Sequence, residues 1–249
     1  ADAKAADTPE KRRGVGIAWG GFNVTEGGGD SAEVALELMP GNKIRKYDTW
    51  HAMGQGATTG SLVVTLEALK EMHLTPEDIQ LIQNDTKTCP DTGMAGASRS
   101  LYMDGNATII AANKLLAAMR KEDGTLRTYD EMKAEGIETK YLGRYETNTT
   151  PGLCRLDPNT GIGDPTPAFT YCLNLAEVEV DTKTGKTTVL KFTCVDFVGR
   201  IGNIDAVNGQ AYSGIMHGIG FALKEDYADV KKHANMFGAG TSYIKDVPD

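Results

Sequence analysis

The sequence has little cysteine, and none of it is arranged to bind a metal or a cluster. Four cysteines occur among 249 residues, at Cys89, Cys154, Cys172 and Cys194. No C-x-x-C pair is present, so the sequence predicts neither a zinc site nor the ligands of an iron–sulfur cluster. We expect four free, buried thiols.

Long apolar runs and clustered positive charge are also lacking. No segment approaches the ~20 apolar residues that cross a bilayer, and residues 1–10 have no signal-peptide core. We therefore expect a cytoplasmic protein without a membrane partner. The net charge of -8 argues against nucleic acid, because phosphate binding requires clustered Lys and Arg. The only basic run, Lys11-Arg12-Arg13, is interpreted as part of a linker.

Glycine, in contrast, is abundant. The chain has 29 glycines, while its 40% hydrophobic and 24% charged residues are typical of a folded soluble protein. Many of the glycines gather in three short clusters. Such clusters indicate backbone that turns tightly or comes close to a ligand.

Hydrophobic periodicity predicts hairpins combined with strand-loop-helix units. Alternation predicts one hairpin over residues 33–47, which turns at Pro40-Gly41-Asn42, and a second over residues 176–196. The other predicted elements are helices over residues 61–73, 98–121, 128–135 and 204–223, and strands over residues 14–24 and 79–83. The core face of the second helix would be Ile109, Ala112, Leu116 and Met119. This mixture predicts an α+β (mixed α/β) fold.

We expect two lobes. The predicted divisions are a linker over residues 1–13, a first lobe over 14–148, a connecting loop over 149–167 and a second lobe over 168–249. The connecting loop is predicted from its four prolines and many glycines.

The first glycine cluster, Met53-Gly54-Gln55-Gly56-Ala57, lies in a predicted loop over residues 51–60. Its glycines let the backbone approach a ligand, and the Gln55 amide offers both a donor and an acceptor. The helix that follows can support anionic groups. An ordinary turn would produce the same triplet. His51, just ahead of it, is a candidate to line a metal site.

The second cluster lies in the predicted loop over residues 93–100. Gly96 and Ala97 leave room for a bulky ligand, Ser98 and Ser100 supply hydroxyls, and Arg99 supplies positive charge. A serine helix cap with an exposed arginine is the alternative interpretation. The P-loop pattern is absent. A third cluster, residues 209–220, places glycines within a predicted helix, where close packing would explain them.

The three clusters resemble, in the same order, the cofactor-binding segments of molybdenum hydroxylases of the xanthine oxidase type. They are the M-G-Q-G-A loop, the G-A-S-R-S loop and the G-Q-A-Y-S-G…G-I-G helix. Nearly the whole chain shares this resemblance, and it is greatest to the bacterial aldehyde oxidoreductases. The resemblance implies a molybdopterin cofactor in its cytosine dinucleotide form. It also implies that the pterin dithiolene, and no protein side chain, holds the molybdenum.

The resemblance also implies roles for particular residues. Gln55 matches a glutamine that donates a hydrogen bond to an oxygen ligand of molybdenum. Gly96 and Ala97 match small residues beside the metal, and Ser98, Arg99 and Ser100 match the loop that holds the pterin and phosphate. Such enzymes hydroxylate aldehydes or heterocycles with oxygen from water and pass electrons to [2Fe–2S] clusters.

One element of the family is missing. The catalytic glutamate of a G-x-G-E motif is absent from this chain, where Gly238-Ala239-Gly240 is followed by Thr241. We therefore expect part of an enzyme, without turnover of its own. The resemblance implies that the iron–sulfur domains and the first half of the cofactor domain lie elsewhere in the same protein, and that the complete enzyme is a homodimer.

Two alternatives remain open. A truncated, non-catalytic scaffold or assembly fragment without cofactor would also lack the glutamate. An unrelated nucleotide-binding domain could use the Gly96–Ser100 loop.

Overall fold

The computed structural model describes residues 7–24, 29–83, 85–96, 98–147, 154 and 156–224. Its sheets and helices confirm the α+β fold. Contacts divide the chain into two units. The packed unit comprises residues 21–171 and 198–203. The open unit comprises, among described residues, 7–20, 172–197 and 204–224. The division differs from the predicted lobes, because residues 14–20 join the unit that contains the second hairpin.

The packed unit contains a four-stranded sheet in the order β4-β3-β2-β5. Its strands are β2 (Ser31–Met39), β3 (Lys43–Asp48), β4 (Ile79–Gln83) and β5 (Lys140–Glu146). Strand β2 is antiparallel to β3 and β5, whereas β3 and β4 are parallel. The predicted first hairpin and the strand at 79–83 are confirmed. Strand β5 was not predicted, because Gly143 interrupts its apolar alternation.

The two faces of this sheet differ in chemistry. Along β2, Val34, Leu36 and Leu38 have no exposed surface. Two of the alternate residues are charged and pair across strands, Glu37 opposite Arg45 and Glu33 opposite Arg144, while Ala35 between them is buried. This period of two gives the sheet one apolar face for helices and one polar face.

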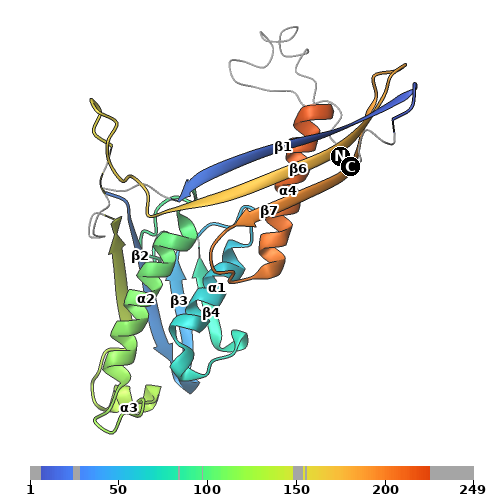
Figure 1. Cartoon of the computed structure of the whole chain (residues 1–249). Coiled ribbons are helices and arrows are strands. Elements are labelled where there is room, and N and C mark those ends of the chain that lie inside the picture. Colours follow the sequence, from blue (N-terminus) through green and yellow to red (C-terminus); the bar gives the residue numbers. More distant parts are fainter. Residues whose placement is uncertain are drawn as a thin grey trace, which may run out of the picture. The chain divides into compact units, whose positions relative to one another are not determined.

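Helices α1 (Ala57–Ala68) and α2 (Ser100–Met119) cover the apolar face (Figure 1). Helix α2 lies so close to β5 that a Cβ atom at Gly143 would be 2.0 Å from the Ala107 carbonyl oxygen. Helix α3 (Tyr129–Ala134) begins after Thr128, whose side chain and that of Glu131 form a capping box. The predicted helices at 61–73, 98–121 and 128–135 are therefore present with shifted ends.

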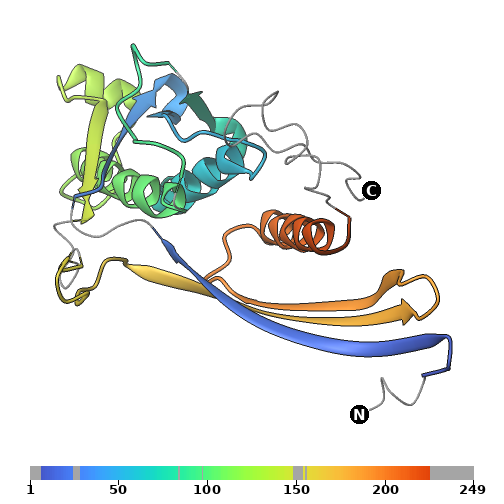
Figure 2. The same cartoon turned by 90° about the horizontal axis from the view of Figure 1, so that it is seen from above.

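The open unit contains one helix and most of the residues of three long strands (Figure 2). Strands β1 (Lys11–Val24), β6 (Ala168–Asp181) and β7 (Thr187–Phe197) form a sheet in the order β1-β6-β7. Helix α4 (Ile204–Leu223) has the predicted bounds. The second hairpin is confirmed and its strands are longer than predicted.

Strand β1 corrects two predictions. Its apolar residues indicated a buried strand, but Ile17 is 66% exposed and Trp19 is 76% exposed. The linker predicted over residues 1–13 is wrong for its last three residues, which are part of the strand. Lys11 and Arg13 both form ion pairs with Glu179 on β6, which fixes this end of β1 in the sheet.

None of the four cysteines is buried, so the expectation of buried thiols is wrong. Among the described helices, none is long and apolar enough to span a bilayer.

Candidate functional site

Both predicted cofactor loops begin at the same edge of the packed unit's sheet. Strands β3 and β4 are parallel, with α1 as the crossover between them. Their carboxyl ends, Asp48 and Gln83, are paired neighbours in the register. The chain leaves the sheet from these two positions into one loop that ends at α1 and another that ends at α2. The carboxyl edge of parallel strands is where α/β sheets commonly bind ligands.

Threonine side chains join the two loops at their bases. The Thr49 amide donates to the Thr92 hydroxyl over 2.9 Å, and the Thr92 amide donates to the Thr49 hydroxyl over 3.2 Å. The Thr92 hydroxyl also donates to the Glu33 carbonyl oxygen. The structure therefore brings together two segments that the sequence separates by about forty residues.

Gln55 organises the first loop. Its Nε2 atom donates to the His51 carbonyl oxygen over 2.9 Å, and its Oε1 atom accepts from the Met53 amide. Gly54 and Gly56 have φ angles of +104° and +84°, which other residues rarely adopt. A glutamine amide has two donor hydrogens and two acceptor lone pairs. Gln55 can therefore hold this turn and still offer one donor and one acceptor to a ligand.

The other predicted residues of this loop differ in accessibility. The Met53 side chain is 72% exposed, whereas Ala57 is only 3% exposed and can offer a ligand little beyond its backbone. His51 is exposed, and its Nδ1 atom lies 3.2 Å from the Thr49 carbonyl oxygen.

Arg99 is neither a free cation for a ligand nor the exposed arginine of the alternative interpretation. It is 3% exposed, and it donates to both carboxylate oxygens of Asp30 over 2.7 and 2.8 Å. Its remaining N–H groups bond to the carbonyl oxygens of Ser31, Thr92 and Met94. This planar fork locks the second loop onto the start of β2. A ligand would meet the loop's backbone rather than a free guanidinium group.

Two helices begin at this edge, and neither has a side-chain cap. The residues before α1 and α2, Gly56 and Arg99, make no side-chain cap hydrogen bond. The first amides of such helices carry partial positive charge and bind anions. Ser98, with φ of +53°, and Ser100 place their hydroxyl groups at the second helix start.

Small residues leave this helix start open. A Cβ atom at Gly96 would contact only Met94, at 3.7 Å. Ala97 lies outside the described residues. The arrangement of two uncapped helix starts with small and hydroxyl-bearing residues is suited to an elongated, phosphate-bearing ligand.

The sequence did not indicate three buried ionisable residues beneath the loops. Lys46, Asp48 and Asp104 have no exposed surface. Burial raises the pKa of Asp104 to about 6, against the opposing attraction of Lys46. The alternation of β3 offered a signal for the other two, because Lys46 and Asp48 share the face of buried Ile44.

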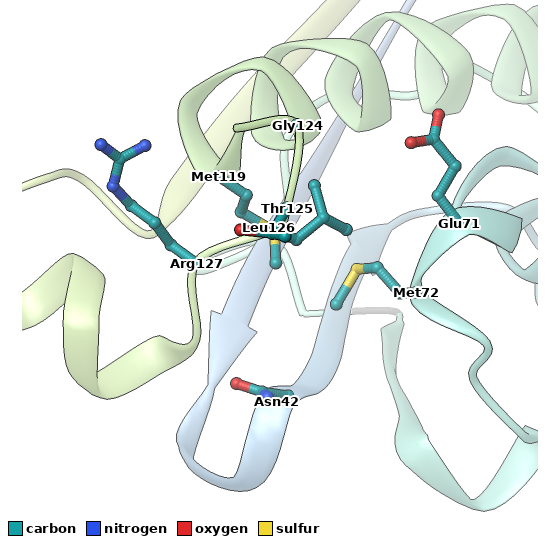
Figure 3. A pocket seen from close by; sticks show the side chains of 8 residues that line it. All are labelled: Asn42, Glu71, Met72, Met119, Gly124, Thr125, Leu126 and Arg127. Carbon is teal, nitrogen blue, oxygen red and sulfur yellow. The ribbon is translucent and has the colours of Figure 1, made fainter. Parts of the chain in front are cut away.

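One cavity of the packed unit lies away from the two loops. A shallow cavity of about 380 Å³ is lined by Asn42, Glu71, Met72, Met119, Gly124, Thr125, Leu126 and Arg127 (Figure 3). It lies beyond the amino end of β3, opposite the end that carries the loops. Its charged groups are already paired, Glu71 with Arg120 and Arg127 with Glu135. The described part of the chain contains no group of three His, Cys, Asp or Glu residues that could hold a metal.

Comparison with known proteins gives extensive matches. The family model of the molybdopterin cofactor-binding domain matches residues 1–248. The aldehyde oxidoreductase of Megalodesulfovibrio gigas is 39% identical over 247 residues, which are 99% of this chain and 27% of that protein. The chain therefore spans about a quarter of this curated relative.

Comparison with solved structures also gives matches over nearly the whole chain. The aldehyde oxidoreductase from Desulfovibrio desulfuricans superposes with a TM-score of 0.86 at 42% identity, over 99% of this chain and 27% of that one. CO dehydrogenase from Oligotropha carboxidovorans has a TM-score of 0.69 at 16% identity, over 96% of this chain and 33% of that one, a likeness of fold alone.

Proposed function

The chain belongs to the molybdopterin cofactor-binding domain family, and on that premise we propose that it forms the cofactor-embedding part of an aldehyde oxidoreductase. The observation that carries the proposal is the joined pair of loops, each ending in an uncapped helix start at one sheet edge. The 39% identity to an aldehyde oxidoreductase supports aldehydes over heterocycles as substrates. The proposed chemistry is hydroxylation of an aldehyde to a carboxylic acid with oxygen from water.

The described residues fit such a cofactor. Molybdopterin in a dinucleotide form carries phosphates, and the helix starts after Gly56 and Arg99 provide amides for anions. A Cβ atom at Gly54 would meet nothing within 4 Å, so a bulky group can approach the backbone there. We propose that Ser98 and Ser100 donate to the cofactor, in its cytosine dinucleotide form. The cofactor supplies the molybdenum at which the oxidation takes place.

The chain's own residues would bind and orient the cofactor. Gln55 would use its remaining donor and acceptor toward the molybdenum end, while its bonds to the 51–53 backbone hold the loop. Arg99 would act indirectly, by fixing the loop that carries Gly96 and Ser98. Because the chain spans 27% of its relative, we propose that the electron-accepting [2Fe–2S] clusters lie in other parts of a longer protein and that the complete enzyme is a homodimer.

The experiment that tests this proposal is analysis of the intact protein for molybdenum and released pterin. We expect about one of each per chain, together with oxidation of aldehydes. An aldehyde-oxidising protein without metal and pterin would overturn the proposal. A plain nucleotide bound in place of pterin would instead favour the unrelated nucleotide-binding interpretation.

Gln55→Ala tests the role of the first loop. We expect kcat for aldehyde oxidation to fall roughly fivefold, because about 1 kcal/mol of hydrogen bonding is lost at the reacting end of the cofactor. Steady-state kinetics on variants matched for molybdenum content measure this effect. Gln80→Ala, on strand β4 and outside both loops, is the matched control and should keep normal turnover. Unchanged turnover of Gln55→Ala would contradict the assigned role.

A further inference from the structure

Three fully buried ionisable side chains lie beneath the first loop, and we call Lys46, Asp48 and Asp104 the buried centre. The Lys46 Nζ atom lies 2.7 Å from Asp104 Oδ1 and 3.2 Å from Asp48 Oδ2, and all three side chains have 0% exposure. Lys46 and Asp48 are on β3, whereas Asp104 is on α2. One positive charge thus faces two carboxyl groups, and none of the three groups is accessible to solvent.

Asp48 connects the segments on both sides of the loop. Its Oδ1 atom accepts from Gln83 Nε2 over 2.6 Å and from the Trp50 amide over 3.3 Å. Its Oδ2 atom accepts from the Ser61 hydroxyl over 2.7 Å. Trp50 precedes the loop and Ser61 lies in the first turns of α1, which follows it. One carboxylate therefore holds the entry and the exit of the 51–56 loop.

Packing reinforces these hydrogen bonds. The Trp50 side chain is 6% exposed, and Lys46 Nζ lies 5.8 Å from the centre of its ring. A Cβ atom at Gly60 would be 3.3 Å from Trp50 Cη2, so glycine at this position lets α1 lie close to the indole without a tight contact. Gln83 Nε2 also lies 3.5 Å from the Trp50 carbonyl oxygen. The loop is thus anchored to β3, β4 and α1 together.

Stability alone does not account for the buried centre. Removing two or three charges from water costs several kcal/mol per ion, and replacing buried ion pairs by apolar residues of similar volume is often neutral or stabilising. Here the Asp104 Oδ2 atom has no partner at all among the described residues. What the centre supplies is a fixed geometry, since hydrogen bonds to a carboxylate are directional and apolar contacts are not.

We propose that Asp48, held by Lys46, is a positioning residue that sets where the 51–56 loop and the start of α1 meet the molybdopterin. This inference rests on the proposed function and adds three residues that neither the glycine clusters nor the family resemblance indicated. Asp48 acts through the Trp50 amide and the Ser61 hydroxyl, and so through the backbone that carries Gln55. Asp104 is the second carboxyl group that holds Lys46 in place.

The test uses the intact, molybdenum-containing protein with Asp48→Asn, which keeps the side-chain volume and removes the carboxylate. Met132→Ala, a truncation of a fully buried residue on α3, is the control for general destabilisation. We expect Asp48→Asn to lower kcat about tenfold at little change in KM. We also expect an altered Mo(V) electron paramagnetic resonance spectrum. The control should lower the thermal midpoint and keep the wild-type spectrum and kcat per molybdenum.

Ser61→Ala provides a second variant in case Asp48→Asn does not fold. It removes one hydrogen bond to Asp48 and leaves all charges in place, so we expect a smaller change of the spectrum in the same direction. Wild-type spectrum and kcat in whichever variant folds would overturn the inference. Wild-type protein without molybdenum and pterin would overturn the proposed function instead, so the two failures are distinguishable.

Discussion

The packed unit and the open unit are built from similar elements but differ in how far their apolar side chains are buried. In the packed unit, β2 has fully buried apolar residues at alternate positions, and two helices bury this apolar face. All described hydrophobic side chains that are buried belong to this unit. In the open unit, helix α4 buries only Gly220, and β1 exposes Ile17 and Trp19.

The difference separates the site from its surroundings. The loops of the packed unit are anchored to a core, so they can hold a fixed shape before any ligand binds. The open unit owes its order to hydrogen bonds between strands and to ion pairs such as Lys11–Glu179. Its exposed apolar side chains fit our proposal that the chain is part of a longer protein, because large apolar patches mark interaction surfaces.

The largest expected effect contrasts the same truncation in the two units. Leu38→Ala in the packed unit should lower the free energy of unfolding by about 2–5 kcal/mol, because it leaves a cavity in a fully buried position. Leu190→Ala in β7, where the side chain is 44% exposed, should change it by less than about 0.5 kcal/mol. Denaturant unfolding of the chain measures both. Equal losses in the free energy of unfolding would contradict the difference in packing between the two units.

Glycine substitutions give the next contrast. Gly143→Ala should destabilise by about 3 kcal/mol, because the new Cβ atom would overlap the Ala107 carbonyl oxygen and α2 must move. Gly16→Ala in β1 meets nothing within 4 Å and should change stability by less than about 1 kcal/mol. Thermal unfolding compares the two variants. A neutral Gly143→Ala would show that α2 packs less closely on β5.

A pH titration tests the buried centre itself. Burial raises the pKa of Asp104 from 3.8 to about 6, so the folded protein binds this proton more tightly than the unfolded chain. The stability that the group contributes is therefore greatest below pH 3.8 and is lost as the pH rises through about 6. The stability of wild type relative to Asp104→Asn should fall by about 3 kcal/mol between these limits. Denaturant unfolding at several pH values measures it, and a constant difference would contradict it.

The smallest effect concerns the open unit. Glu179 accepts hydrogen bonds from Lys11 and Arg13, which lower its pKa. Glu179→Gln should lower the thermal midpoint by only about 1–3 °C at low salt, and less at high salt, because its partners Lys11 and Arg13 are open to screening by salt. A large, salt-independent loss would show that this sheet depends on the pairs more than its exposure suggests. Glu10→Gln, which removes the exposed pair with Lys183, is the matched control.

Much of the fold could be predicted from local patterns. The alternation of β2 and β3 predicted their hairpin, and the glycine-rich helix at 204–223 was predicted with its observed bounds. Helix α1 begins at Ala57 rather than at residue 61, because Trp50 packing at Gly60 outweighs the low helix propensity of its first turn. In α2, Ile109 was predicted for the core but is 46% exposed, while Leu115 is fully buried. The other three residues predicted for this core face, Ala112, Leu116 and Met119, are buried, so the prediction is confirmed except at Ile109.

The sequence by itself determined the two glycine-rich loops, the helices that follow them and the family of the chain, because turn chemistry and motif order are local properties. Only the tertiary structure decided what each side chain does at the site. The parallel pairing of β3 with β4 brings the loops to one edge. The packing of α2 on the sheet turns Arg99 inward onto Asp30 and encloses Lys46 between two carboxyl groups. Such roles depend on which polar groups are buried from solvent once the helices cover the sheet. A local sequence pattern does not contain this information.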